Sequence, residues 1–166
     1  KDLRINSDII SSLPDNDPDA VLFKKLGEQF GGFEMGMIII ETENIFQKDV
    51  IEHIKQITDT LRTIDGISNI TSLTSIIDIK GGDYGIEIGK LVDEYDLPST
   101  PEEMEELRDR VFSKDMYKGV IVSEDSTASL IIFNLPEVAD VKTVAGEVKR
   151  KINSLELPEK IYFSGS

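Results

Sequence analysis

Two stretches of the chain, MGMIIIE (35–41) and TASLIIFNL (127–135), open segments with the same expected order of elements. Each stretch is an apolar run of strand length. Each is followed by a region with helical spacing of apolar residues and then by another short strand pattern. These segments cover residues 35–74 and 127–166. A βαβ pattern that occurs twice in this way predicts a split βαββαβ sandwich of the α+β class.

The helical spacing is clearest after the first strand. Apolar side chains recur every three or four residues from Phe46 to Ile64, and a second stripe runs from Val141 to Leu155. Asn44 followed by Gln47 resembles a capping box at the start of the first helix. The two halves together predict a ferredoxin-like fold, which hosts many unrelated functions and therefore names none.

Residues 75–126 separate the two halves and predict an inserted helix and hairpin. Glycines between positions 81 and 85 punctuate a short strand or hairpin region. The sequence TPEEMEELRDRVF (100–112) predicts a helix with Thr100 as its N-cap. Strands over 119–123 and 127–134 are expected to form a β-hairpin.

No flexible linker interrupts this order, so we expect a single domain over residues 1–166. Its parts are a leading arm and helix (1–34), the first βαβ half (35–74), the insertion (75–126) and the second half (127–166). The first strand is apolar at even and odd positions alike, which is typical of a central strand that is covered on both sides.

Composition excludes several classes of function. With 18 basic and 32 acidic residues, the formal net charge of −14 opposes binding to nucleic acid or to anionic lipid headgroups. The chain has no cysteine and one histidine, His53, which we expect at the edge of a helix stripe. Residues 15–26 imitate a calcium loop, but Ala20 and Leu26 stand where glycine and glutamate are needed. We expect no metal and no cofactor.

No nucleophile, base and orienting partner are indicated together, so the sequence does not predict an enzyme. An acylphosphatase-like enzyme of this fold class would need a phosphate-binding loop with an arginine. The corresponding turn here, Glu41-Thr42-Glu43-Asn44, is acidic and would repel phosphate.

Several stretches, taken in order, resemble exporters of the RND superfamily, in the MmpL-like branch. The first is an acidic-proline segment with a helix ending in Phe-Gly, SSLPDNDPDAVLFKKLGEQFGG (11–32), and the second has a Gly-Ile turn before a Ser-Leu-Thr passage, LRTIDGISNITSLTS (61–75). The third has a Val-Ser acidic turn before an isoleucine-rich strand, GVIVSEDSTASLIIFNL (119–135), and the fourth contains a final Ser-Gly, FSGS (163–166). In the family, such a chain is the first large extracytoplasmic loop.

The resemblance implies a porter domain on the outer side of the cell membrane, through which lipids, hydrophobic molecules or drugs pass during proton-driven export. Its partners would be the transmembrane helices of the parent and a second similar loop, with homo-oligomerisation left open. Lys1 would follow one membrane helix, and the chain would continue beyond Ser166. Residues that relay protons would lie outside this segment.

The sequence assigns no site residues. Bulky side chains near the insertion could face a substrate, but nothing in the pattern selects among them: Phe30, Phe33, Met35, Met104 and Phe112. The alternative to the exporter is an autonomous ferredoxin-like module that binds a small molecule or regulates a partner.

Overall fold

The computed structural model describes residues 35–135 and 141–165. Within these ranges the protein is a mixed α+β structure with one four-stranded antiparallel sheet, one two-stranded sheet and three helices. The arm and helix expected within residues 1–34 lie outside the described residues.

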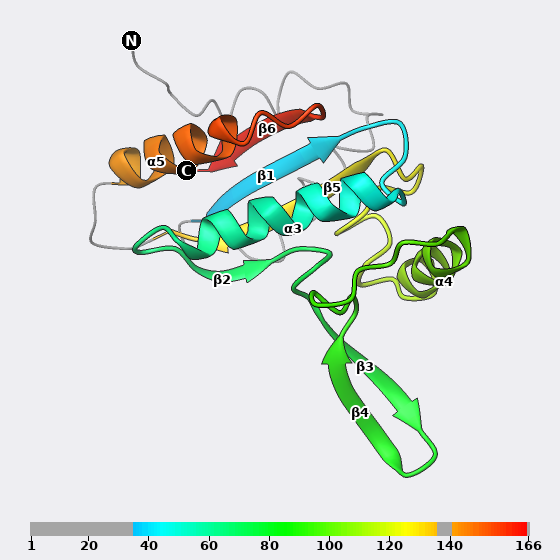
Figure 1. The fold of residues 1–166 in the computed structure, drawn as a ribbon. Helices are drawn as coiled ribbons and strands as arrows, with labels where there is room; N and C mark the ends of the chain where they lie inside the picture. The colour runs from blue at the N-terminus through cyan, green and yellow to red at the C-terminus, as the bar shows by residue number, and fades with distance from the viewer. Residues whose placement is uncertain (1–34, 136–140, 166) are drawn as a thin grey trace.

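The larger sheet has β1 (Met35–Glu41) near its centre (Figure 1). Its strand order is β2-β5-β1-β6, and every neighbouring pair is antiparallel. The other three strands are β2 (Ser68–Thr71), β5 (Ala128–Asn134) and β6 (Lys160–Gly165). Ile38 of β1 stands opposite Ile131 of β5 and Phe163 of β6. The predicted central position of this strand is confirmed.

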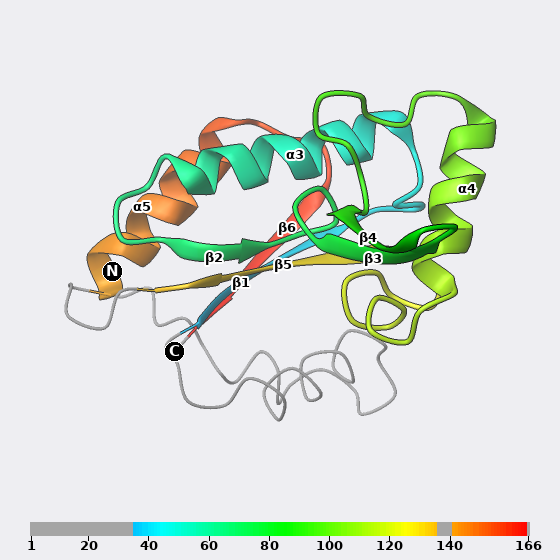
Figure 2. The ribbon, with the colours of Figure 1, turned by 90° about the horizontal axis from the view of Figure 1, so that it is seen from below.

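Two helices cover one face of the sheet, α3 (Lys48–Arg62) and α5 (Val141–Ser154) (Figure 2). The predicted stripe of α3 is fully buried, with Ile54, Ile57 and Leu61 all at 0 % exposure. These side chains belong to one cluster with residues of the sheet and of α5: Ile38, Ile40, Ile131, Phe133, Val144, Val148 and Ile152. Each large apolar side chain buried in this way contributes about 1.5–3 kcal/mol.

The start of α3 differs from the sequence prediction. The helix begins at Lys48, and its N-cap residue Gln47 makes no capping bond with its side chain. Asn44 Oδ1 instead accepts a hydrogen bond from the backbone N–H of Phe46, at 3.0 Å. The expected Asn44–Gln47 capping box is therefore wrong. The reason is tertiary, because buried Ile45 donates its N–H to the carbonyl of Ser126 and fixes the turn ahead of the helix.

The opposite face of the sheet carries a second apolar cluster. It contains Ile39, Leu130 and Ile132, with Met35 and Met37 packed against it. β1 is thus apolar on both faces, as expected from its sequence. Gly36 lies opposite Phe133, and a Cβ atom at Gly36 would stand 2.2 Å from the Phe133 ring, so no larger residue fits there without movement.

The segment between β2 and β5 contains α4 (Pro101–Phe112), whose predicted start is confirmed. Thr100 Oγ1 accepts from the Glu103 N–H at 3.2 Å, and Glu103 Oε2 accepts from the Thr100 N–H at 3.1 Å. Backbone N–H groups of Ser99 and Thr100 hold the pKa of the Glu103 carboxyl below its usual range. The helix buries Met104, Leu107 and Val111, the three side chains expected from its sequence.

The same segment contains a β-hairpin that projects from the body of the protein (Figure 1). It consists of β3 (Ile77–Gly82) and β4 (Gly85–Lys90), paired without a register shift. Gly85 has φ +129°, a conformation that favours glycine at this turn. The sequence prediction of a hairpin region around these glycines is confirmed.

A buried polar cluster holds the base of this hairpin. The Asp78 side chain, 2 % exposed, accepts hydrogen bonds from Lys114 Nζ and from the Tyr117 hydroxyl. The same two donors reach backbone carbonyls of β3, from Lys114 Nζ to Ile79 at 2.9 Å and from the Tyr117 hydroxyl to Ile77 at 3.1 Å. We call Asp78, Lys114 and Tyr117 the hairpin clamp. It fixes the hairpin to the segment that follows α4.

The expected strand over residues 119–123 is absent, which corrects the sequence prediction. Val122 makes only isolated bridges, to Lys118 and to Ser129. The chain forms successive turns around buried Tyr117, whose carbonyl accepts bonds from the N–H groups of Val120 and Ile121. Gly119 has φ +68°, which an extended strand does not permit. Burial of the Tyr117 ring therefore outweighs the strand propensity of the valines and isoleucine.

The turn expected before β5 is present and is held by Asp125. Its Oδ1 atom accepts from Thr127 Oγ1 at 2.6 Å and from Ser123 Oγ at 2.7 Å. These hydroxyl groups hold the pKa of the Asp125 carboxyl below its usual range.

Replacing Tyr117 with Phe removes both hydroxyl bonds of the clamp and should lower the free energy of unfolding by about 1–2 kcal/mol. Burial and then Asp78 raise the pKa of Tyr117 to about 12, above the value near 10 of an unfolded chain. The stabilisation is thus fully present below pH 10 and is lost toward pH 12. Urea unfolding against pH measures both effects.

Tyr84→Phe at the fully exposed hairpin tip is the matched control and should leave the stability unchanged within about 0.5 kcal/mol. Equal effects of the two substitutions would contradict the role given to the clamp.

Candidate functional site

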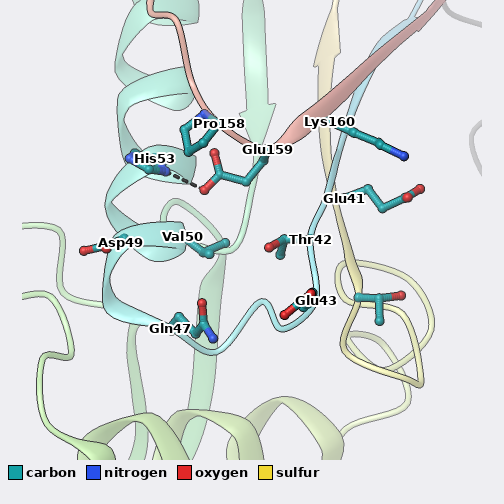
Figure 3. A pocket seen from close by; sticks show the side chains of 11 residues that line it. Glu41, Thr42, Glu43, Gln47, Asp49, Val50, His53, Pro158, Glu159 and Lys160 are labelled. Carbon is teal, nitrogen blue, oxygen red and sulfur yellow. Dashed lines mark hydrogen bonds and ion pairs between the residues drawn. The ribbon is translucent and has the colours of Figure 1, made fainter.

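An open hollow of about 750 Å³ lies where β1 leaves the sheet (Figure 3). One wall is the first part of α3, with Asp49, Val50 and His53. The opposite wall is the end of β1 and the turn after it, with Glu41 and Glu43. Pro158 and Glu159 of the loop before β6, with Lys160 at the start of that strand, close one side, and Thr127 also lines the hollow. Three separate segments of the chain, 41–53, 127 and 158–160, therefore build this hollow.

A hydrogen-bonded pair, His53 and Glu159, joins two of these segments. His53 Nδ1 lies 2.6 Å from Glu159 Oε1, and the residues are 106 positions apart in the chain. The Glu159 side chain is only 6 % exposed and that of His53 is 20 % exposed. His53 was expected at the edge of the buried stripe, and its partial exposure agrees with that. The bond fixes the start of β6 to α3.

The second oxygen of the Glu159 carboxyl group is buried without a partner. No group in the described part of the chain donates a hydrogen bond to Oε2. An unsatisfied buried acceptor of this kind costs about 1–3 kcal/mol. Because this oxygen is itself shielded from solvent, the missing hydrogen bond is an internal cost and not a contact that the open hollow offers to a ligand.

The charge of the hollow defines which ligands suit it. Four carboxylates line it against a single lysine: Glu41, Glu43, Asp49, Glu159 and Lys160. Phosphate or another anion would meet net repulsion here. The acidic turn that argued against a phosphate-binding loop, residues 41–44, contributes its first three residues to one wall of this hollow.

The carboxylates do not converge on a point. Within residues 35–135 and 141–165, no three side chains of His, Asp or Glu are placed to hold a metal ion. The hollow as it stands suits a neutral or cationic molecule with hydrogen-bond donors.

The bulky side chains considered from the sequence do not form a common surface. Met104 and Phe112 pack in the main core, where the Phe112 ring centroid lies 6.0 Å from that of Phe46. Met35 packs on the other face of the sheet. Phe30 and Phe33 lie outside the described residues. Sequence reasoning missed Glu159, because its partner is distant in the chain and no local spacing marks it.

No protein-family model matches this chain, and no curated protein matches it either. None of the helices in the described ranges is long and apolar enough to span a membrane.

Replacing His53 with Leu should lower the free energy of unfolding by about 1–3 kcal/mol, because the buried Glu159 carboxylate loses its hydrogen bond. Adding Glu159→Leu should recover part of this loss, because it removes the unpaired charge. Urea unfolding of the two single variants and the double variant gives the coupling energy. Additive losses would show that the pair is not coupled in the folded state. Gln56→Leu, at an exposed position of α3, is the control for the helix itself.

Proposed function

We propose that this chain is the porter domain of an RND-superfamily exporter of the MmpL-like branch, with a ferredoxin-like fold. The observation that carries the proposal is the way in which the two βαβ halves share one sheet. The first half supplies central strand β1 and edge strand β2, and the second half supplies central strand β5 and edge strand β6. This interleaved order, with α3 and α5 on one face, supports the proposed split βαβ sandwich.

The proposal places the domain on the extracytoplasmic side of the cell membrane. It works there as part of a passage for lipid, hydrophobic or drug-like molecules and carries no catalysis of its own. Its partners are the transmembrane helices of the parent protein and a second similar loop. The projecting hairpin supports this role, because Ile77, Ile86 and Ile88 are 61–75 % exposed. Apolar side chains that are exposed next to one another are typical of sites that contact another molecule or segment.

The first test is the coding sequence on both sides of this segment. Apolar spans of about 20 residues should precede Lys1 and follow Ser166, with a second similar loop further on. A start codon directly before Lys1 and a stop directly after Ser166 would overturn the proposal.

A functional test uses the complete gene in cells that lack their own efflux pumps. Expression should raise resistance to hydrophobic drugs, and deletion of residues 78–89 should abolish the gain without loss of the protein from the membrane. Resistance that survives the deletion would show that the hairpin is not needed for transport. No gain with the intact gene for any lipid or hydrophobic compound would count against export.

The hollow at His53 and Glu159 supports a second candidate, an autonomous module that binds a small cationic molecule. A diamine such as putrescine supplies ammonium donors that match the carboxylates lining the hollow. Putrescine should raise the melting temperature of the wild-type chain and have a smaller effect on Glu159→Gln, with Glu105→Gln on exposed α4 as the control. Equal shifts in all three would indicate binding by general surface charge and remove this candidate.

A further inference from the structure

One face of the projecting hairpin is apolar except for Lys90 at its base, which stands opposite Ile77. In its register Ile79 stands opposite Ile88, with Ile77 two residues before Ile79 and Ile86 two residues before Ile88. Residues that are paired across strands, or two apart along one strand, share a face of the sheet. All four isoleucines therefore point to the same side, and each is 57–75 % exposed.

The two outer edges of the hairpin differ. The backbone N–H of Leu91 donates to the carbonyl of Ile76, so these two residues form a hydrogen-bonded pair across the hairpin. In an antiparallel ladder such pairs alternate with pairs that are not hydrogen-bonded to each other, so Ile77 and every second residue after it direct their N–H and C=O groups away from the partner strand. On β3 these outward carbonyls include those of Ile77 and Ile79, and the clamp already occupies both. On β4 the outward groups are those of Ile86, Ile88 and Lys90. Among the described residues no strand pairs with this edge.

The β4 edge also lacks the features that usually prevent strand pairing. The larger sheet protects its β2 edge, which has four residues, a register shift, and Asn69 at φ 49°. β4 has six residues, GIEIGK, with no proline and no bulge, and its lysine lies at the base. The two outward residues in its middle are isoleucines, which have high strand propensity. An unprotected edge of this kind is a site for another strand.

We propose that the β4 edge pairs with β4 of a second copy of this chain, antiparallel and centred on Ile88. The four-stranded sheet formed in this way joins the two isoleucine faces on one side. This inference goes beyond the proposed function and does not depend on it, because it uses only the geometry of the hairpin.

Charge disfavours two alternative registers and favours the antiparallel direction. Centring on Glu87 would place two glutamates opposite each other, and centring on Lys90 would do the same with two lysines, which is unfavourable. Centring on Ile88 places Glu87 opposite Gly89 of the partner and pairs residues 86–90 of the two copies. Each copy carries a net charge of −14. Antiparallel pairing keeps the two acidic bodies at opposite ends of the strand, about 20 Å apart, beyond the screening length of about 8 Å.

Single-cysteine variants test the pairing, because the chain has no cysteine of its own. In the proposed register the two copies of residue 88 have Cα atoms about 5.5 Å apart, within the range for a disulfide. The matched control is Ile79→Cys, which lies on the same face of the hairpin. In the proposed four-stranded sheet the two copies of residue 79 are separated by three strand spacings, about 14 Å. Under mild oxidation Ile88→Cys should form a disulfide-linked dimer, and Ile79→Cys should remain monomeric.

A proline pair tests the backbone bonds themselves. Ile88→Pro removes an outward N–H at the centre of the proposed ladder and no bond within the hairpin. Ile79→Pro makes the same change on the β3 edge. Sedimentation equilibrium should show a dimer for the wild type and for Ile79→Pro, and a monomer for Ile88→Pro, with circular dichroism confirming that each variant is folded.

Two results would overturn the proposal. One is a wild-type chain that stays monomeric at every concentration, with no cross-linking of Ile88→Cys. The other is equal cross-linking of Ile79→Cys and Ile88→Cys, which would indicate that two hairpins stack face to face or meet a different partner.

Discussion

The burial of β1 on both faces is the constraint on which the rest of the structure depends. Ile38 and Ile40 face the helices, and Ile39 faces the other cluster. A strand of this kind must have covering layers on both sides and a partner at each edge. β5 and β6 occupy those edges, and α3 follows from the end of the strand. The position of the acidic hollow results from this, because it forms where β1 ends and the chain turns toward α3.

Elements with strong periodicity could be predicted from the sequence, and elements fixed by single distant contacts could not. The apolar residues at helical spacing in α3 and α4 and the apolar residues on both faces of β1 could be recognised locally in the sequence. The core buries these same residues, so the predictions are confirmed. The start of α3 was predicted wrongly, because buried Ile45 and its bond to Ser126 override a plausible cap. The strand expected before β5 was lost to the burial of Tyr117. Glu159 was not predicted, because its role exists only once β6 lies beside α3.

The hollow and the hairpin have opposite chemistry and lie in different parts of the molecule. The hollow concentrates carboxylates between two walls, the end of β1 and the start of α3. The hairpin presents aliphatic side chains, and its own two strands would be only marginally stable in isolation. The hairpin clamp offsets this weakness, because a buried aspartate that is paired with a half-buried lysine and a tyrosine hydroxyl fixes the direction in which the hairpin points. A fixed direction lowers the entropy that any partner must remove on binding.

The pairing of β1 with β6 also has a consequence for how the chain folds. Gly36 lies opposite Gly165, so the central strand finds one of its two neighbours at the far end of the described chain. During synthesis β1 emerges well before β6 and keeps one edge open until β6 has left the ribosome. Contacts this distant in sequence slow folding, because a long loop must close before they form. Meanwhile the isoleucines of β1 are available to wrong partners, and we expect a dependence on chaperones that the finished structure no longer reveals.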